Sequence, residues 1–207
     1  MTVQNADTSQ IIIEKTVELF KKYGVHYVTM DLIAEQLGMS KKTLYVHFNN
    51  KRDLVWHAIE THLEGLGREI DKLYNESSNE VKTMLGMMNK IIDFINNQNP
   101  LLHEEMHRYY PEIAQQIDKH RWEENYEKML RLVEKGKERN MFRQDVNSDI
   151  VAKLFLVDVN NITNTDLFPH DKYSKKELIK HVFVNFLRGI VTPKGLEILE
   201  QNEQLPE

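Results

Sequence analysis

The chain has 207 residues, of which 41% are apolar and 29% are charged, and its formal net charge is −5. That length suits one compact domain, or a small module joined to a larger one. The absence of cysteine excludes disulfides, thiolate metal sites and cysteine nucleophiles, and it is typical of the reducing cytoplasm. With only 8 glycines and 5 prolines, the composition favours an all-α fold.

Neither a targeting segment nor a membrane span is evident in the sequence. Residues 1–9 are polar and lack the basic-then-apolar plan of a signal peptide. No stretch approaches the roughly 18 uninterrupted apolar residues that a membrane span needs. We therefore expect a cytoplasmic protein without a membrane partner.

The charge is distributed unevenly along the chain. Residues 1–57 carry seven Lys/Arg and six Asp/Glu, whereas the remainder carries 20 and 26. Lys41, Lys42, Lys51 and Arg52 lie within twelve residues that contain no acid. A local basic patch of this kind binds phosphates, while the acidic remainder limits non-specific association.

The first predicted helix spans about Ser9–Tyr23, because apolar residues recur there at helical spacing. Asp7, Thr8 or Ser9 is suited to cap its start, and Gly24 is suited to close it.

Two short helices follow, with only Gly38-Met39 between them. The first begins after Thr29, an N-cap residue, and stops at Gly38. The second begins after a further N-cap residue, Ser40, and runs to about Val46. Two capped helices with so short a link predict a helix-turn-helix.

A longer helix begins at Asn49 or Asn50 and continues to about Tyr74. Asn50 and Asp53 are spaced like a capping box at its start. Residues 75–79 are predicted to form a loop.

Five further helices are predicted in the rest of the chain. They span about 80–98, 101–110, 112–138, 148–163 and 174–191. Pro100 closes the first of them, Ser148 caps the fourth, and Ser174 with Glu177 forms a capping box for the fifth. Residues 192–195 are predicted to end that last helix.

Three residue types meet the steric demands of a helix-turn-helix at residues 29–48. Ala34 is the small residue at which the second helix crosses the first, Gly38 tolerates the positive φ of the turn, and Leu44 points into the corner. The exposed face then carries hydrogen-bond donors around one aromatic ring. These residues are Ser40, Lys41, Lys42, Thr43, Tyr45 and His47. Such donors suit base edges and phosphate oxygens, so this face is predicted to bind double-stranded DNA.

The segment TMDLIAEQLGMSKKTLYVHFNNKRDL, residues 29–54, closely resembles the DNA-binding segment of the TetR family of transcriptional regulators. The resemblance covers about residues 9–57. It implies about nine helices, a two-fold dimer built from the last two helices, a ligand cavity in the regulatory core, and ligand binding that loosens DNA binding. It also implies that Lys41, Lys42, Thr43 and Tyr45 approach bases, whereas Thr29, His47 and Lys51 hold the backbone.

The organisation expected from these observations has two parts. An N-terminal three-helix DNA-binding domain with the helix-turn-helix occupies residues 1–48. A larger helical domain for ligand sensing and dimerisation occupies residues 49–207. No enzymatic activity, cofactor or metal is expected, and the effector is a small molecule of unknown identity.

The last two predicted helices have rich apolar faces, and we interpret these faces as a homodimer contact, because a palindromic operator needs two copies at a fixed separation. The residues assigned to this contact are Leu154, Val157, Leu178, Val182, Phe186 and Gly189. The alternative is that these residues fill an intramolecular core.

The middle of the chain is rich in methionine and aromatic residues, which suit an adaptable cavity but more often fill a plain core. The residues assigned to a ligand pocket are Met84, Met88, Met106, Tyr110, Trp122 and Tyr126. A regulator without any ligand, controlled by a protein partner, is the alternative.

Residues His103–His107 fit the pattern H-E-x-x-H, in which two histidines one helical turn apart bind zinc and the glutamate acts as a base. A zinc-dependent hydrolase that uses His103, Glu104 and His107 is therefore the competing hypothesis. No particular third ligand stands out, and the segment is short. The sequence favours a ligand-responsive DNA-binding regulator, most simply a repressor, over this enzyme.

Overall fold

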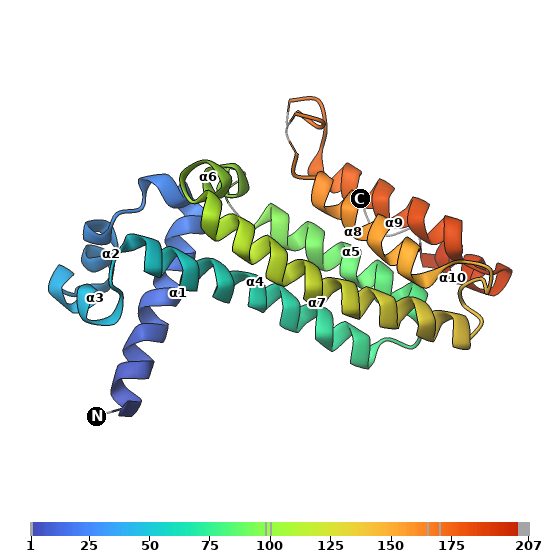
Figure 1. The fold of residues 1–207 in the computed structure, drawn as a ribbon, viewed down its shortest axis with the longest axis horizontal. Coiled ribbons are helices and arrows are strands. Elements are labelled where there is room, and N and C mark those ends of the chain that lie inside the picture. The colour runs from blue at the N-terminus through green and yellow to red at the C-terminus, as the bar shows by residue number, and fades with distance from the viewer. Residues whose placement is uncertain (1, 98, 100, 165, 170, 203–207) are drawn as a thin grey trace. The chain divides into compact units, whose positions relative to one another are not determined.

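The computed structural model describes residues 2–97, 99, 101–164, 166–169 and 171–202, and its described side chains begin at Thr8. These residues form ten helices and no named strand (Figure 1). The helices are α1 Thr2–Tyr27, α2 Met30–Leu37, α3 Lys41–His47, α4 Lys51–Glu76, α5 Glu80–Asn96, α6 Leu102–Tyr109, α7 Pro111–Glu138, α8 Ser148–Asn161, α9 Lys175–Ile190 and α10 Pro193–Asn202. The predicted all-α class is confirmed. Across the described residues, no helix has the length and apolar character needed to cross a bilayer.

Helix α1 differs from its prediction at both ends. It begins at Thr2, so Ser9 lies inside the helix and is not its cap. At the other end, Gly24 adopts φ 78° and ψ 172°, which interrupts the helix before a last turn that ends at Tyr27. The prediction that Gly24 closes the regular helix is therefore right, because only glycine adopts this conformation without strain.

Two terminal signals in the second half were misjudged from the sequence. The cap of α8 is Asn147, whose side chain accepts from the amide of Ile150. The predicted cap, Ser148, is instead a buried first residue. Ser174 does precede α9 but makes no side-chain capping bond, so the predicted capping box is absent there.

Proline is the first residue of two helices. Pro111 is the first residue of α7, and Pro193 is the first residue of α10, which was not predicted. Both agree with the preference of proline for the first helical position, where its missing N–H has no helical partner. The closing role predicted for Pro100 lies outside the described residues.

The chain divides into two compact units. Unit 1 comprises residues 1–67 and 96–118, and unit 2 comprises residues 68–95 and 119–207. Each unit has its own apolar core. The boundary predicted after residue 48 divides the DNA-binding domain from the regulatory domain, and it does not coincide with the division into packing units. This functional boundary stays a prediction.

In unit 1, α1 packs against α2, α3 and α6. Leu44, Leu54 and Ile33 are fully buried in the core of this unit. Burial of each such side chain stabilises the fold by about 1.5–3 kcal/mol. The recognition corner is therefore anchored by apolar contacts from three different helices.

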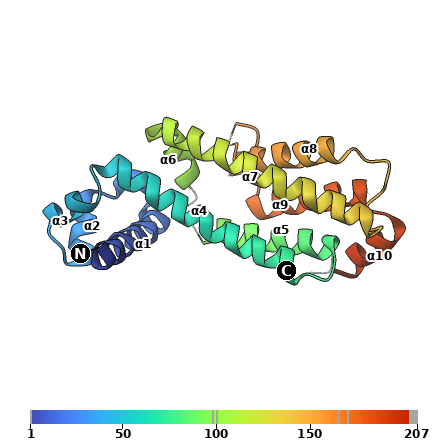
Figure 2. The same cartoon turned by 60° about the horizontal axis from the view of Figure 1, so that its bottom comes forward.

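In unit 2, α8 and α9 lie side by side in both views (Figures 1 and 2). Their contact is aromatic, because the ring of Phe155 meets the rings of Phe183 and Phe186 at centroid distances of 4.9 and 4.7 Å. Such pairs contribute about 0.5–1.5 kcal/mol beyond their buried area.

Gly136 near the end of α7 lets the ring of Phe142 pack directly on the helix backbone. A Cβ at this position would overlap the ring, and Phe142 is fully buried. We predict that Gly136→Ala lowers the free energy of unfolding by about 1–3 kcal/mol through overpacking. Urea denaturation measures this change.

Gly86→Ala is the matched control within the same unit, because its Cβ would meet only the flexible end of Leu73 at 3.0 Å. Equal losses for the two variants would refute the role assigned to Gly136.

Candidate nucleic-acid interface

The corner formed by α2 and α3 has the geometry of a helix-turn-helix. Thr29 Oγ1 accepts from the amide of Leu32 at 3.1 Å, and Ser40 Oγ accepts from the amide of Thr43 at 3.1 Å, so both predicted caps are confirmed. Gly38 adopts φ 63°, and the chain resumes with Met39 N bonded to the carbonyl of Ala34 at 2.9 Å.

The three residues assigned to the corner occupy the places that the sequence predicts. Ala34 is 5% exposed and Leu44 is fully buried, so α3 crosses α2 closely. Gly38 has the left-handed conformation that the turn requires.

The outer face of α3 is exposed and mostly polar. Lys42 is exposed and has no ion-pair partner among the described side chains, while Tyr45 is 46% exposed. Between Tyr45 and His47, Val46 is the most exposed apolar residue of this helix at 68%. Sequence reasoning missed Val46. An exposed methyl-bearing side chain among polar residues was the available signal, because such a group suits a thymine methyl.

Two of the predicted DNA contacts are engaged with neighbours. Lys41 Nζ donates to Asp31 Oδ2 at 2.9 Å, and this bond raises the pKa of Lys41 above its usual value. Thr43 Oγ1 shares a hydrogen bond with Ser40 Oγ at 2.8 Å. Because the pair of Lys41 and Asp31 is exposed to solvent, it is weak and can open when a phosphate competes.

Two other predicted contacts have roles inside the protein. His47 Nδ1 lies 2.9 Å from Ser9 Oγ, which links the end of α3 to α1. Lys51 Nζ donates to the carbonyl of Val25 at 2.8 Å and to that of His26 at 3.3 Å. Burial lowers the pKa of Lys51, and nearby Glu105 opposes this shift. The ammonium group of Lys51 therefore binds protein carbonyls instead of extending into solvent.

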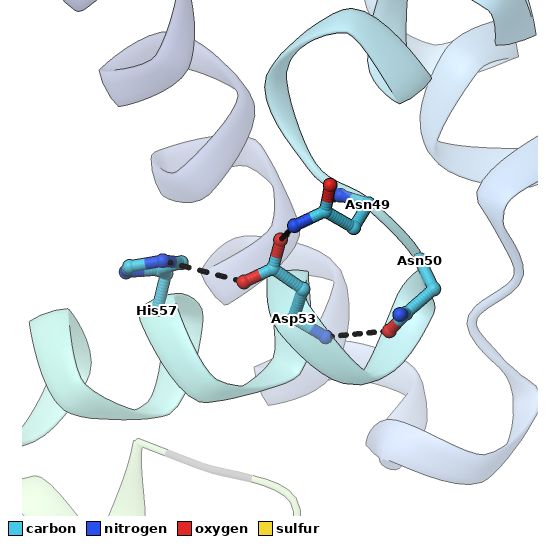
Figure 3. A network of polar contacts seen from close by, with 4 residues as sticks. All are labelled: Asn49, Asn50, Asp53 and His57. Atoms are coloured by element: carbon cyan, nitrogen blue, oxygen red, sulfur yellow. Dashed lines mark hydrogen bonds and ion pairs between the residues drawn. The ribbon is translucent and has the colours of Figure 1, made fainter.

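The start of α4 is ordered by a polar network (Figure 3). Asn50 Oδ1 accepts from the amide of Asp53 at 2.9 Å, as the predicted capping box requires. Asp53 Oδ2, however, accepts from the backbone and side-chain nitrogens of Asn49 at 2.9 and 3.0 Å instead of reaching the amide of Asn50. His57 Nε2 lies 3.5 Å from Asp53 Oδ1, so this carboxylate joins the link after α3 to the first two turns of α4.

A buried carboxylate from α6 organises the end of α1. Glu105 is 9% exposed, and its Oε2 accepts from the amides of Val25 at 2.6 Å and His26 at 3.1 Å. A Cβ at Gly24 would overlap this carboxylate. Glu105 binds the amides and Lys51 the carbonyls of the same two residues, Val25 and His26, and we call these contacts the α1 bracket.

Sequence reasoning missed the α1 bracket. In the sequence, Glu105 is only the unassigned third residue of the H-E-x-x-H segment. Its contact residues lie about 80 positions earlier, so no local pattern indicates the contact. Stacking of His26 on Tyr109, with ring centroids 4.2 Å apart, adds a second contact between α1 and α6.

The H-E-x-x-H segment does not form a metal site in the described structure. The rings of His103 and His107 lie 4.4 Å apart, but Glu104 pairs with Arg108 at 2.7 Å. His107 Nε2 lies 3.6 Å from Asp118 Oδ2. Among the described residues, no group of three His, Asp or Glu side chains is placed to hold a metal ion.

The residues assigned to a ligand pocket belong to two different cores. Met84 and Met88 are buried in the core of unit 2, and Trp122 and Tyr126 pack against that core. Met106 is buried in unit 1, and Tyr110 packs against that core. Tyr126 also donates through its hydroxyl to Asp149 at 2.6 Å. The pocket itself stays a prediction.

The residues assigned to a dimer contact fall into two groups. On α8, Leu154 is 57% and Val157 is 44% exposed, and neighbouring Ile150 is 52% exposed. On α9, Leu178, Val182 and Phe186 pack partly against the core of unit 2. The remaining residue, Gly189, is exposed and has open space at its Cβ position.

We predict that Glu105→Ala lowers the free energy of unfolding by about 2–4 kcal/mol, because it leaves the buried amide of Val25 and the partly buried amide of His26 without a charged acceptor. Thermal and urea denaturation followed by circular dichroism measures the loss. The neighbouring variant Glu104→Ala removes only an exposed pair with Arg108 and should cost less than about 0.5 kcal/mol. A Glu105→Ala protein as stable as Glu104→Ala would contradict the α1 bracket.

Comparisons with known proteins agree with this geometry. Residues 12–58 match the family described as bacterial regulatory proteins, tetR family. The uncharacterized HTH-type transcriptional regulator YvaF of Bacillus subtilis is 24% identical over 180 residues, which cover 86% of this chain and 93% of that protein. The HTH-type transcriptional activator FasR of Mycolicibacterium smegmatis is 26% identical over 103 residues, and this match spans about half of each chain (48% and 47%).

Solved structures show the same fold. A transcriptional regulator from Cytophaga hutchinsonii superposes with a TM-score of 0.73 at 20% identity, covering 88% of this chain and 98% of that one. A regulator from Saccharomonospora viridis, solved in complex with choline, superposes with a TM-score of 0.71 at 17% identity, covering 90% and 99%. The helix-turn-helix, the family match over residues 12–58 and the shared fold agree, and the chain is similar to the tetR family of bacterial transcriptional regulators.

Proposed function

We propose that this chain is a cytoplasmic repressor that binds a palindromic operator as a homodimer and leaves it when a small molecule binds. The observation that carries this proposal is the outer face of α3, on which Lys42, Tyr45 and Val46 are exposed to solvent. This helix belongs to a helix-turn-helix whose two helices are both capped. A rigid corner with a donor-bearing outer helix is the arrangement that presents side chains to the major groove.

The α3 face divides into reading and positioning residues. Lys42 suits guanine edges and Val46 suits a thymine methyl, so these two residues are assigned to base reading. Tyr45 and Lys41 are assigned to adjacent bases or phosphates. Thr29 and Ser40 lie at helix starts, where free amides favour phosphate oxygens.

The dimer is supported by the apolar face of α8. Ile150, Leu154 and Val157 are each at least 44% exposed and lie on one side of that helix. Three large apolar side chains on one exposed face favour a covered surface over a solvated one. Two copies would hold the recognition helices about 34–36 Å apart, which is one turn of DNA.

Release by a small molecule is proposed to act through the α1 bracket. Lys51 is the first residue of α4 and Glu105 lies in α6, and both bind backbone groups of the two residues that follow Gly24. A ligand that favours a different position of α4 or α6 would strain these bonds and shift the population away from the DNA-binding form. The choline complex of the Saccharomonospora viridis regulator is an example of a small ligand on this fold.

Replacing Lys42 and Tyr45 together by alanine should weaken operator binding by at least about 100-fold, because each residue contributes roughly 1–3 kcal/mol of contact. The lysine change alone should also reduce the salt dependence of binding by about one counterion. Genomic fragments selected by the wild-type protein, titrated by fluorescence anisotropy at several salt concentrations, provide the measurement.

The controls for this titration are Lys82→Ala and Tyr173→Ala, which replace exposed residues of unit 2. Tyr173 is a close match because it is 45% exposed, compared with 46% for Tyr45. If the controls weaken binding as much as the α3 variants do, α3 is not the reading helix.

Leu154→Glu should convert the dimer to monomer at micromolar concentration and weaken operator binding, because it places a charge in an apolar contact. Sedimentation velocity reports the oligomeric state. Leu167→Glu is the control, since Leu167 is equally exposed at 58% but lies between α8 and α9 outside the assigned face. A wild-type protein that sediments only as monomer would exclude the proposed dimer.

A further inference from the structure

Arg121 in α7 carries a guanidinium group that is enclosed but not satisfied. Its side chain is only 17% exposed, and its Nε and Nη2 atoms are shielded from solvent. Neither atom has a hydrogen-bond partner among the described residues. Among the described side chains, its one ion-pair partner is Glu124, whose Oε2 lies 3.4 Å from Nη1 and which is 43% exposed.

An enclosed arginine with two unpaired nitrogens is unfavourable in the isolated protein. Guanidinium N–H groups removed from water lose their hydration, and only a facing anion or acceptor replaces it. The same helix offers a contrast in Arg131, which is 67% exposed and keeps its hydration beside Glu127. The enclosure of Arg121 is therefore a specific feature of its place on the helix.

The unsatisfied atoms are those that bind a planar anion. Nε and one terminal nitrogen of a guanidinium form a parallel pair of donors that matches two oxygens of a carboxylate or a phosphate. An anion there would restore both missing hydrogen bonds.

The next residues of α7 on the buried side are apolar. Trp122 and Tyr126 pack against the core of unit 2, and Met129 lies within it, 1% exposed. Arg121 is thus followed along α7 by aromatic and sulfur-containing side chains, which suit an apolar body.

We propose that Arg121 binds the anionic group of the effector, and that the effector is an amphipathic molecule with a carboxylate or phosphate group joined to an apolar body. This inference rests on the proposed release by a small molecule and names the chemical class of that molecule. Arg121 is a ligand-binding residue in this scheme, and it holds no part of the fold together.

Thermal unfolding of the full-length protein with three ten-carbon probes tests the inference. The probes are decanoate, decyl phosphate and the uncharged decanol, each used below the concentration at which it forms micelles. The variants are Arg121→Met, which keeps the apolar stem without the charge, and Arg131→Met as the control on the same helix.

Decanoate or decyl phosphate is expected to raise the melting temperature of the wild-type protein by about 5–10 °C at a hundredfold excess over its Kd. Decanol should bind about 10- to 100-fold more weakly, because it lacks the charge-assisted bonds. A preference for one of the two anions identifies the headgroup. Arg121→Met should lose the preference for the anion, whereas Arg131→Met should keep it.

The stability of Arg121→Met without a probe separates ligand binding from a structural role. Removing an enclosed charge whose Nε and Nη2 lack partners, and whose one pair is with a 43% exposed Glu124, should leave the melting temperature unchanged or raise it. Equal binding of decanoate, decyl phosphate and decanol to the wild-type protein would overturn the inference. A preference for the anions that survives in Arg121→Met, or the absence of any effect of all three probes, would overturn it as well.

Operator titrations keep this result distinct from the proposed function. Arg121→Met should bind the operator as the wild type does without a probe, and only the wild type should lose affinity when the anion is added. Intact operator binding together with no anion effect refutes the effector class alone. If the wild-type protein does not bind the operator even without a probe, the proposed function is refuted instead.

Discussion

The two residues after Gly24 are bound through their amides by a carboxylate and through their carbonyls by an ammonium group. Glu105 accepts from the amides of Val25 and His26, while Lys51 donates to their carbonyls. Each of these residues belongs to a different helix from α1, so α1, α4 and α6 meet at one short stretch of backbone. The stretch has left the regular helix at Gly24, and its polar groups would otherwise be unpaired. The position of the helices that carry the recognition corner therefore depends on these charge-assisted bonds.

This arrangement explains how residues with similar chemistry take different roles. Lys42 and Lys51 are both basic residues near the corner, but Lys42 is exposed and Lys51 binds carbonyls within unit 1. His47 is likewise held by Ser9, whereas Tyr45 and Val46 face outward. The residues that hold the corner in place are thus distinct from those that remain available to DNA, and a rigid reading surface needs both kinds.

Unit 2 has two features that its own packing does not require. One is the exposed apolar face of α8, which a second copy of the chain would cover. The other is the unsatisfied guanidinium of Arg121, which an anion would satisfy. Both features destabilise the isolated chain. A second copy of the chain would remove the first cost, and a bound anion would remove the second. A regulator that responds to a small molecule needs sites of this sort, because a ligand shifts an equilibrium only through interactions that one state lacks.

The sequence alone determined the helical class, the recognition corner and its two caps. These features rest on local chemistry: Thr29 and Ser40 bond to amides three residues away, and Gly38 supplies a φ that other residues avoid. The start of α10 at Pro193 obeys an equally local rule, but the sequence reading took that proline as a stop. Tertiary structure decided what local rules do not contain. Glu105 reaches its partners across about 80 residues, and Lys51 and His47 are held by segments 26 and 38 positions away. Which charged side chains stay free, and which are enclosed, depends on packing between distant segments, and no local pattern records that packing.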